Sequence, residues 1–154
     1  MGLQRLIRSQ RVADVDCRDP ITLDARATLG EALRVMQTRA VGCVLATEGE
    51  ALVGIFTERD VVRALAAGAT MAAPLADHMS RNPTCVRSDD PLVKALGHMC
   101  RGGFRHLPIV DGAGKPIGSV SVKRALHHLG DLMPGAVYNL PPDPHEYPAT
   151  AEGG

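Results

Sequence analysis

The sequence predicts a mixed α/β (α+β) fold built from two tandem copies of one strand–helix–strand–strand–helix unit. The chain matches itself at an offset of 63 residues, as in Ala13 and Ala76, and the offset becomes 64 after one extra residue in the Gly112–Pro116 turn. Short apolar runs alternate with helix-capping signals in both copies. With 154 residues, 45% of them hydrophobic, the chain suits one compact domain or two subdomains that share a core.

The internal repeat is carried by groups of identical or similar residues that occur in one order. The matched pairs are Ala13/Ala76, Asp14/Asp77, Arg18/Arg81, Asp19/Asn82, Pro20/Pro83, Leu29/Leu92, Ala32/Ala95, Leu33/Leu96, Met36/Met99, Gly54/Gly118, Thr57/Ser121 and Arg59/Lys123. A unit of roughly sixty residues buries too little surface alone and usually needs a partner. We therefore expect the two copies to pack against each other.

The first copy begins with a short strand and a capped helix. The strand is predicted at Ile21–Leu23, and the helix follows Thr28, with Glu31 as the capping-box partner. Next come a buried strand, a turn, a second strand and a helix that Thr57 caps and Gly68 ends. These elements are expected at Gly42–Thr47, Glu48–Glu50, Ala51–Phe56 and from Thr57 to about Ala66.

The second copy repeats this order with different capping residues. Asp90 is the expected N-cap of its first helix, and Pro91 is the expected first helical residue. The remaining elements are expected at Leu107–Val110, the Asp111-Gly112 turn, Pro116–Val120 and about Val122 to Leu129.

Charge and composition exclude several classes of protein. The 17 Lys and Arg residues balance the 17 Asp and Glu residues, so no global field attracts nucleic acid or an anionic membrane. The chain has no apolar run of membrane-spanning length, no signal-peptide pattern at its start and no C-x-x-C pair among its four cysteines. We therefore expect a soluble cytoplasmic protein with reduced thiols. Neighbouring His127 and His128 would point in different directions on a helix, so no structural metal is predicted.

Both ends of the chain fall outside the repeats. Residues 1–11 form an N-terminal arm, and residues 134–154 contain five prolines and acidic residues without Lys or Arg. Such a composition predicts an extended, mobile tail.

The sharpest candidate site runs from Gly54 to Asp60, where a strand leads into a helix N-terminus. Free backbone N–H groups there suit an anion, and the Thr57 hydroxyl could bind a phosphate or ribose oxygen. The Asp60 carboxylate could accept hydrogen bonds from both hydroxyls of a ribose, and Arg59 could contact phosphate. The plainer alternative is that Thr57 and Asp60 only cap the helix. The two roles are compatible.

The two copies resemble a pair of CBS domains, known as a Bateman module. The first copy carries this resemblance in RDPITLDARATLGEALRVM and VGCVLATEGEALVGIFTERDVVRAL, and the second in RNPTCVRSDDPLVKALGHM and FRHLPIVDGAGKPIGSVSVKRAL. The resemblance covers about Val12 to Leu129, with repeats at 12–68 and 75–130. It implies a disc-like pair about a pseudo-twofold axis, with two clefts that bind AMP, ADP, ATP or S-adenosylmethionine. It often implies a homodimer. We expect no catalytic cofactor.

The resemblance also implies roles for particular residues. Asp60 would bind the ribose, and the adenine would lie against Ile21 and Thr22 of the first strand and Cys43 and Val44 of the second. Core packing is the alternative role for Cys43 and Val44.

In the second copy, the segment containing Arg105, His106 and Pro108 would face the phosphates. The alternatives are an exposed arginine and a hydrogen-bonded core histidine.

One position of the second copy departs from the family pattern. Arg124 aligns with Asp60, and arginine has donors only, so it cannot accept from a ribose diol. Ser121 and Lys123 remain beside it. We therefore expect one good nucleoside site per chain, and a second cleft that is empty or holds a phosphate or another anion.

Three classes of function stay open from the sequence. The favoured one is a sensor whose bound adenine nucleotide or adenosyl ligand alters a separate, unidentified target protein. The second is a ligand-free interaction module that acts as a dimerisation unit. The third, an enzyme, lacks support because the chain has no recognisable nucleophile–base pair, paired-carboxylate site or P-loop.

Overall fold

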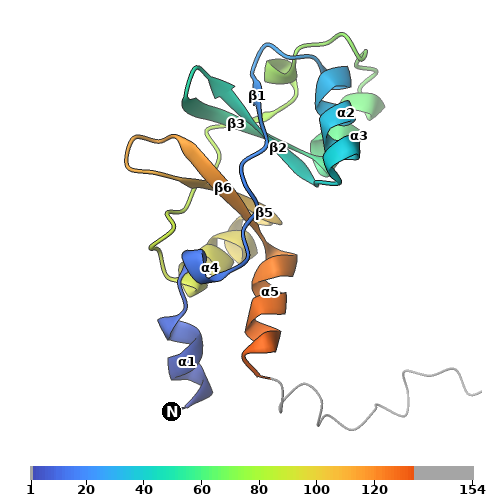
Figure 1. Ribbon diagram of the computed structural model, residues 1–154. Helices are drawn as coiled ribbons and strands as arrows, with labels where there is room; N and C mark the ends of the chain where they lie inside the picture. The colour runs from blue at the N-terminus through green and yellow to red at the C-terminus, as the bar shows by residue number, and fades with distance from the viewer. Residues whose placement is uncertain (1, 134–154) are drawn as a thin grey trace, which may run out of the picture.

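The computed structural model describes residues 2–133, and the predicted mobile tail lies outside the described residues. A four-stranded sheet with the order β1-β2-β3-β4 and a two-stranded sheet of β5 and β6 form the two halves of the molecule. In Figure 1, α2 and α3 lie together beside the larger sheet, while α4 and α5 flank the smaller one. The predicted mixed fold of two tandem repeats is confirmed.

Most elements lie close to their predicted positions, but α1 and β4 were not predicted, and the first strand expected in the second repeat is reduced to a bridge between Val86 and Ile109. The helices are α1 (Leu3–Ser9), α2 (Leu29–Arg39), α3 (Glu58–Ala66), α4 (Leu92–Gly102) and α5 (Val122–Asp131). The strands are β1 (Thr22–Asp24), β2 (Cys43–Glu48), β3 (Ala51–Thr57), β4 (Ser80–Arg81), β5 (His106–Val110) and β6 (Pro116–Ser121), and two 3-10 turns span Val12–Asp14 and Leu75–Asp77. No helix within residues 2–133 has the length and apolar character needed to cross a membrane.

The predicted capping box at the start of α2 is confirmed. The Glu31 N–H donates to the Thr28 hydroxyl at 3.2 Å, and the Thr28 N–H donates to the Glu31 carboxylate at 2.7 Å. Ala40 ends the helix in the left-handed region, with a φ of 51°. The capping box needs only residues three positions apart, while the N–H groups of Leu29 and Gly30 donate to the distant carbonyls of Ala73 and Met71, each at 2.9 Å.

The predicted N-cap of α4 is wrong. Pro91, not Asp90, is the N-cap, and the Asp90 carboxylate instead accepts from the Arg87 N–H at 2.8 Å and from Lys94 Nζ at 2.7 Å. The Leu92 N–H donates to the Gln10 carbonyl at 2.9 Å. Because the N-terminal segment supplies this acceptor, the helix does not need a capping side chain from its own neighbourhood.

The two repeats are interleaved. Val12 and Val15, which precede the first repeat's strands, pack in the core of the second repeat. Leu75 and Met79, which lead into the second repeat, pack in the core of the first. In the same way, β4 pairs with β3 of the first repeat, and the segment at Arg18 forms a bridge to β6. The core of each repeat is thus completed by the segment that leads into the other repeat, which we call the entering segment of that other repeat.

Candidate functional site

Two cavities lie between the repeats, each at the N-terminus of one repeat's last helix. The α3 cavity, of about 310 Å³, contains Thr57 and Asp60 at the start of α3. The α5 cavity, of about 770 Å³, contains Ser121 and Arg124 at the start of α5. Because the entering segments are exchanged, each helix start faces strands of the opposite repeat.

A reciprocal cap holds Asp60 at the wall of the α3 cavity. Oδ2 of Asp60 accepts from the Thr57 N–H at 2.9 Å and from the Thr57 hydroxyl at 2.9 Å. The other oxygen, Oδ1, has no hydrogen-bond donor among residues 2–133, and its ion-pair partner, Arg63 Nη1, is 3.6 Å away. Asp60 is only 5% exposed and is the one buried polar or charged residue in the described part of the chain. One oxygen thus serves the helix while the other keeps its acceptor capacity.

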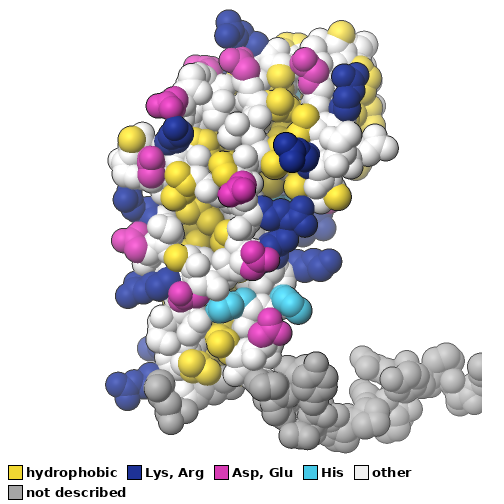
Figure 2. Space-filling model, in the orientation of Figure 1, with side chains coloured by type: hydrophobic (Ala, Val, Ile, Leu, Met, Phe, Trp, Pro, Cys, Tyr) yellow, Lys and Arg dark blue, Asp and Glu magenta, His cyan; other side chains and the backbone are white. Residues whose placement is uncertain are grey.

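Four arginines line the same cavity as this carboxylate. Arg59, Arg63, Arg81 and Arg105 line the α3 cavity, against the acidic side chains of Glu58 and Asp60. This local excess of positive charge suits an anionic ligand, although the whole chain is neutral. Figure 2 shows Lys and Arg side chains gathered at the junction of the two halves of the molecule.

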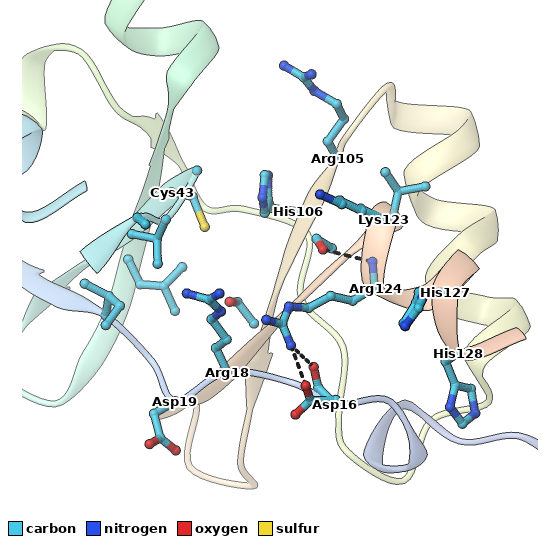
Figure 3. Close-up of a pocket in the computed structure, with 18 of the residues that line it drawn as sticks. Asp16, Arg18, Asp19, Cys43, Arg105, His106, Lys123, Arg124, His127 and His128 are labelled. Atoms are coloured by element: carbon cyan, nitrogen blue, oxygen red, sulfur yellow. Dashed lines mark hydrogen bonds and ion pairs between the residues drawn. The ribbon is translucent and has the colours of Figure 1, made fainter. Parts of the chain in front are cut away.

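The α5 cavity keeps one half of this cap and has the opposite charge at the key position. The Ser121 hydroxyl accepts from the Arg124 N–H at 3.3 Å, as Thr57 does from Asp60. Nη1 of Arg124 pairs with Oδ2 of Asp16 at 2.9 Å (Figure 3). In the same view, Arg18 reaches into the cavity beside Arg124, Lys123 lies near His106, and the Arg105 side chain points away from these groups.

Four residues, Gly42, Glu58, Arg105 and His106, line both cavities. Burial lowers the pKa of His106 below its usual value, opposed by the nearby Glu58 carboxylate and reinforced by Arg105. His106 is therefore neutral near neutral pH and can donate or accept a hydrogen bond. The two cavities therefore share part of their walls.

The structure divides the predicted site residues between the two cavities. Thr57, Arg59 and Asp60 line the α3 cavity, whereas Ile21, Cys43, Ser121 and Lys123 line the α5 cavity. Arg105 and His106 line both. Thr22 is exposed, Val44 and Pro108 are fully buried, and none of these three lines either cavity.

The expectation that Ile21 and Cys43 lie beside Asp60 is corrected by this division. The exchange of entering segments brings Pro83 and Thr84 to the α3 cavity instead. They are the repeat counterparts of Pro20 and Ile21, and so the internal repeat contained the signal for them.

None of the described residues forms a group of three or more His, Cys, Asp or Glu side chains able to hold a metal ion.

Comparison with known proteins identifies the repeats. The CBS domain family matches residues 12–67 and 75–131. An uncharacterized 17.7 kDa protein of Acidianus ambivalens is 30% identical over 123 residues, which are 79% of this chain and 74% of that protein. The chain spans only about a fifth of the length of CBS domain-containing proteins of Arabidopsis thaliana, to which it is 36% identical over 110 residues.

Solved structures share the fold. A CBS domain protein from Pyrobaculum aerophilum complexed with AMP is 25% identical, with a TM-score of 0.72, over 79% of this chain and 99% of that one. The CBS domain pair of protein MJ0100, in complex with 5′-methylthioadenosine and S-adenosyl-L-methionine, is 23% identical, with a TM-score of 0.74, over 80% of this chain and 98% of that one.

Proposed function

The chain belongs to the CBS domain family, and from this premise we propose that it is a regulatory module that binds an adenine nucleotide or adenosyl ligand in the α3 cavity and signals to a partner protein. The observation that carries this proposal is the buried Asp60 carboxylate at the start of α3. A buried carboxylate is costly unless hydrogen bonds or charges stabilise it. Here the cap uses one oxygen and leaves the other for a ligand.

The geometry of Asp60 suits a ribose. Oδ1 has free lone pairs, and Oδ2 accepts from Thr57 alone, so the carboxylate retains sites for two hydroxyl donors. The hydroxyls of a ribose provide two donors on adjacent carbons. The ligand would complete the hydrogen bonding of Asp60 without breaking the helix cap.

The charges favour a phosphorylated ligand. Arg59, Arg63, Arg81 and Arg105 outnumber Glu58 and Asp60, and guanidinium groups bind phosphate through charge-assisted, bidentate hydrogen bonds. S-adenosylmethionine carries a sulfonium cation, so it would gain less from this cavity than AMP, ADP or ATP. The AMP complex of the Pyrobaculum aerophilum protein supports this preference.

Pro83, Thr84 and Leu107 would form the base-binding part of the α3 cavity. These residues come from the second repeat, whereas Asp60 comes from the first. A bound nucleotide would therefore contact both repeats at once and could alter their relative position, which is how we propose that it signals.

The test is isothermal titration of nucleotide-stripped protein with AMP, ADP, ATP and S-adenosylmethionine, with and without Mg²⁺. The variants are Asp60→Ala and, as a matched control, Asp89→Ala, which removes an exposed carboxylate outside both cavities. We expect saturable binding of a phosphorylated ligand that Asp60→Ala abolishes and Asp89→Ala retains. Absence of binding by every ligand would contradict the proposal, and so would turnover of the nucleotide during prolonged incubation.

A second candidate function is a dimerisation unit, with or without ligand. Helices α3 and α5 expose Val62 (66%) and Leu126 (59%), which are counterparts in the repeat, and Leu65 lies beside Val62 on α3. Exposed apolar side chains on matched helices favour a contact with a second copy. Light scattering should then give twice the chain mass, reduced to a single chain by Val62→Asp combined with Leu126→Asp.

A further inference from the structure

We propose that the α5 cavity binds a nucleotide that carries a phosphate on its ribose 2′ or 3′ oxygen, and that Arg124 recognises this phosphate. The inference rests on the proposed function, because the orientation of the nucleoside is carried over from the α3 cavity by the internal repeat. It adds a second ligand, of a different kind, at a site where Arg124 stands at the position that Asp60 holds in the first repeat.

The α5 cavity keeps the apolar part of a base-binding site. Ile21 and Cys43 line it as Thr84 and His106 line the α3 cavity, and Val41 and Leu45 extend the apolar surface. Its volume, about 770 Å³, lies within the range of small-molecule sites. The cavity therefore has room and apolar contact for a base with a ribose.

The ribose position is where the two cavities differ. Arg124 holds the position in α5 that Asp60 holds in α3, and its N–H donates to the Ser121 hydroxyl as the Asp60 N–H does to the Thr57 hydroxyl. A carboxylate accepts hydrogen bonds from ribose hydroxyls, whereas a guanidinium only donates and binds phosphate oxygens. The same exchange distinguishes dinucleotide-binding folds, where an acidic residue binds a ribose 2′-hydroxyl and a nearby arginine accommodates a 2′-phosphate.

Four cations of the α5 cavity are available to a ligand with two phosphate groups, and they share the cavity wall with five carboxylates: Asp14, Asp16, Asp19, Glu58 and Asp131. Arg18 and Arg124 converge at one part of the cavity, whereas Lys123 lies near His106 and the Arg105 side chain points away from these groups (Figure 3). Arg105 also lines the α3 cavity, where the phosphates of the proposed nucleotide would lie. A 5′-phosphate would thus approach Lys123, and the second phosphate would approach Arg124 and Arg18.

Asp16 provides the anion for Arg124 in the structure. Its carboxylate lies 2.9 Å from Nη1 of Arg124, and its side chain is 97% exposed. The Arg124 side chain is only 28% exposed, and its Nη1 also donates to the backbone carbonyl of Asp16. The exposed carboxylate is the part of this contact that a phosphate with higher charge would displace. Asp16 therefore competes with the ligand and lowers its affinity.

The experiment titrates adenosine 2′,5′-bisphosphate, adenosine 3′,5′-bisphosphate, AMP and inorganic pyrophosphate into wild type and four variants. Asp60→Ala disables the α3 cavity, Arg124→Met removes the guanidinium, and Asp16→Asn removes the competing charge. The matched control is Arg101→Met, an exposed arginine on α4 that lines neither cavity. Circular dichroism and melting temperature establish that each variant is folded.

We expect one bisphosphate to bind to Asp60→Ala, and its affinity to fall roughly 10- to 100-fold when Arg124→Met is added, as for loss of a charged hydrogen bond. Asp16→Asn should strengthen this binding, and Arg101→Met should leave it unchanged. Weaker binding in Asp16→Asn would contradict the competition. Comparison of the 2′ and 3′ isomers identifies the phosphate position.

The outcomes separate this inference from the proposed function. Binding of AMP that depends on Asp60, without bisphosphate binding that depends on Arg124, overturns the inference and leaves the proposed function intact. Bisphosphate binding that depends on Arg124, without AMP binding, overturns the proposed function of the α3 cavity and supports recognition of a phosphate by Arg124. Pyrophosphate binding as tight as that of the bisphosphates would make the α5 cavity a simple anion site and would also overturn the inference. If Arg124→Met does not fold, Arg124→Lys replaces it, and unchanged bisphosphate affinity in that variant contradicts recognition by the guanidinium.

Discussion

The imidazole of His106 lies against the backbone of Gly42, where the two cavities share a wall. A Cβ atom on residue 42 would come within 3.0 Å of His106 Cε1 and 3.1 Å of Nε2. Because Gly42, the residue before β2, has no side chain, the imidazole of His106 on β5 can occupy this position. Strands from different repeats meet here without space between them.

Gly42→Ala should displace His106 and weaken nucleotide binding. The backbone at residue 42 is not in the positive-φ region, so the alanine is strained only by its contact with the ring. We expect about 1–3 kcal/mol of destabilisation from overpacking and a nucleotide affinity that falls about tenfold. Urea unfolding and titration calorimetry measure the two effects. Gly130→Ala, whose Cβ would meet no atom within 4 Å, should change neither by as much.

Two equivalent helix caps separate stability from binding. Thr57→Val and Thr28→Val each remove a hydroxyl from a capping box, and each should cost about 1 kcal/mol in the free energy of unfolding. Thr57 lines the α3 cavity, whereas Thr28 lines neither cavity. Only Thr57→Val should therefore weaken nucleotide binding. Equal affinities in the two variants would mean that the Thr57 hydroxyl and the position of Asp60 do not matter for the ligand.

The stability of the protein should fall in mild acid because of His106. Burial lowers the folded-state pKa of His106 below 6.5, so below this pH the unfolded chain binds more protons than the folded one. The contribution of neutral His106 to the free energy of unfolding is thus fully present above pH 6.5, and it is lost as the pH falls through the lower, folded-state pKa. His106→Asn should flatten the change between about pH 7.5 and pH 5.5 in urea unfolding. The carboxyl pKa values of Asp24, Asp90 and Asp111 are lowered from 3.8, so their effects fall below this window.

The cysteines should differ in their reaction with iodoacetamide. Burial, and then the Glu58 carboxylate, raise the pKa of Cys43 to about 11, so its reactive thiolate is scarce at neutral pH. Cys100 is exposed. Mass spectrometry after brief alkylation near neutral pH should find Cys100 modified and Cys43 intact. Both should be modified in denaturant, and early modification of Cys43 under native conditions would show that the α5 cavity opens.

Gly54→Ala should destabilise the first repeat through Met79, a residue at the start of the second repeat. An added Cβ would overlap Cγ, Sδ and Cε of Met79, which is only 8% exposed. We expect a loss of about 1–3 kcal/mol in urea unfolding. Because both residues fill the same space, Gly54→Ala combined with Met79→Ala should cost less than the sum of the single changes. Additive costs would indicate that the two residues do not contact each other in solution.

Local chemistry explains which elements the sequence predicts. The capping boxes at Thr28 and Thr57 need only residues three positions away, and the strands follow short apolar runs. By contrast, α1 is a seven-residue helix, too short to be stable by itself, and it is held by packing beside α4. The start of α4 likewise depends on the Gln10 carbonyl, which no local pattern near Asp90 indicates.

Single residues of the candidate site could be predicted from the sequence, but the cavity to which each residue belongs could not. Thr57 and Asp60 are recognisable because strand, cap and helix follow one another in the sequence. Ile21 and Cys43 belong to the other cavity because the entering segments cross between the repeats, and this crossing is a tertiary contact. The hydrophobic pattern of one repeat does not indicate which strand of the other repeat faces its last helix.

The exchange of core residues also sets an order for folding during synthesis. The first repeat has its full set of core residues once Met79 has been made. Val12 and Val15 are made long before this, yet their neighbours in the second core include Val120 and Leu129. The earliest of these segments to leave the ribosome is therefore among the last to be buried, and until α5 emerges its apolar side chains remain available to chaperones.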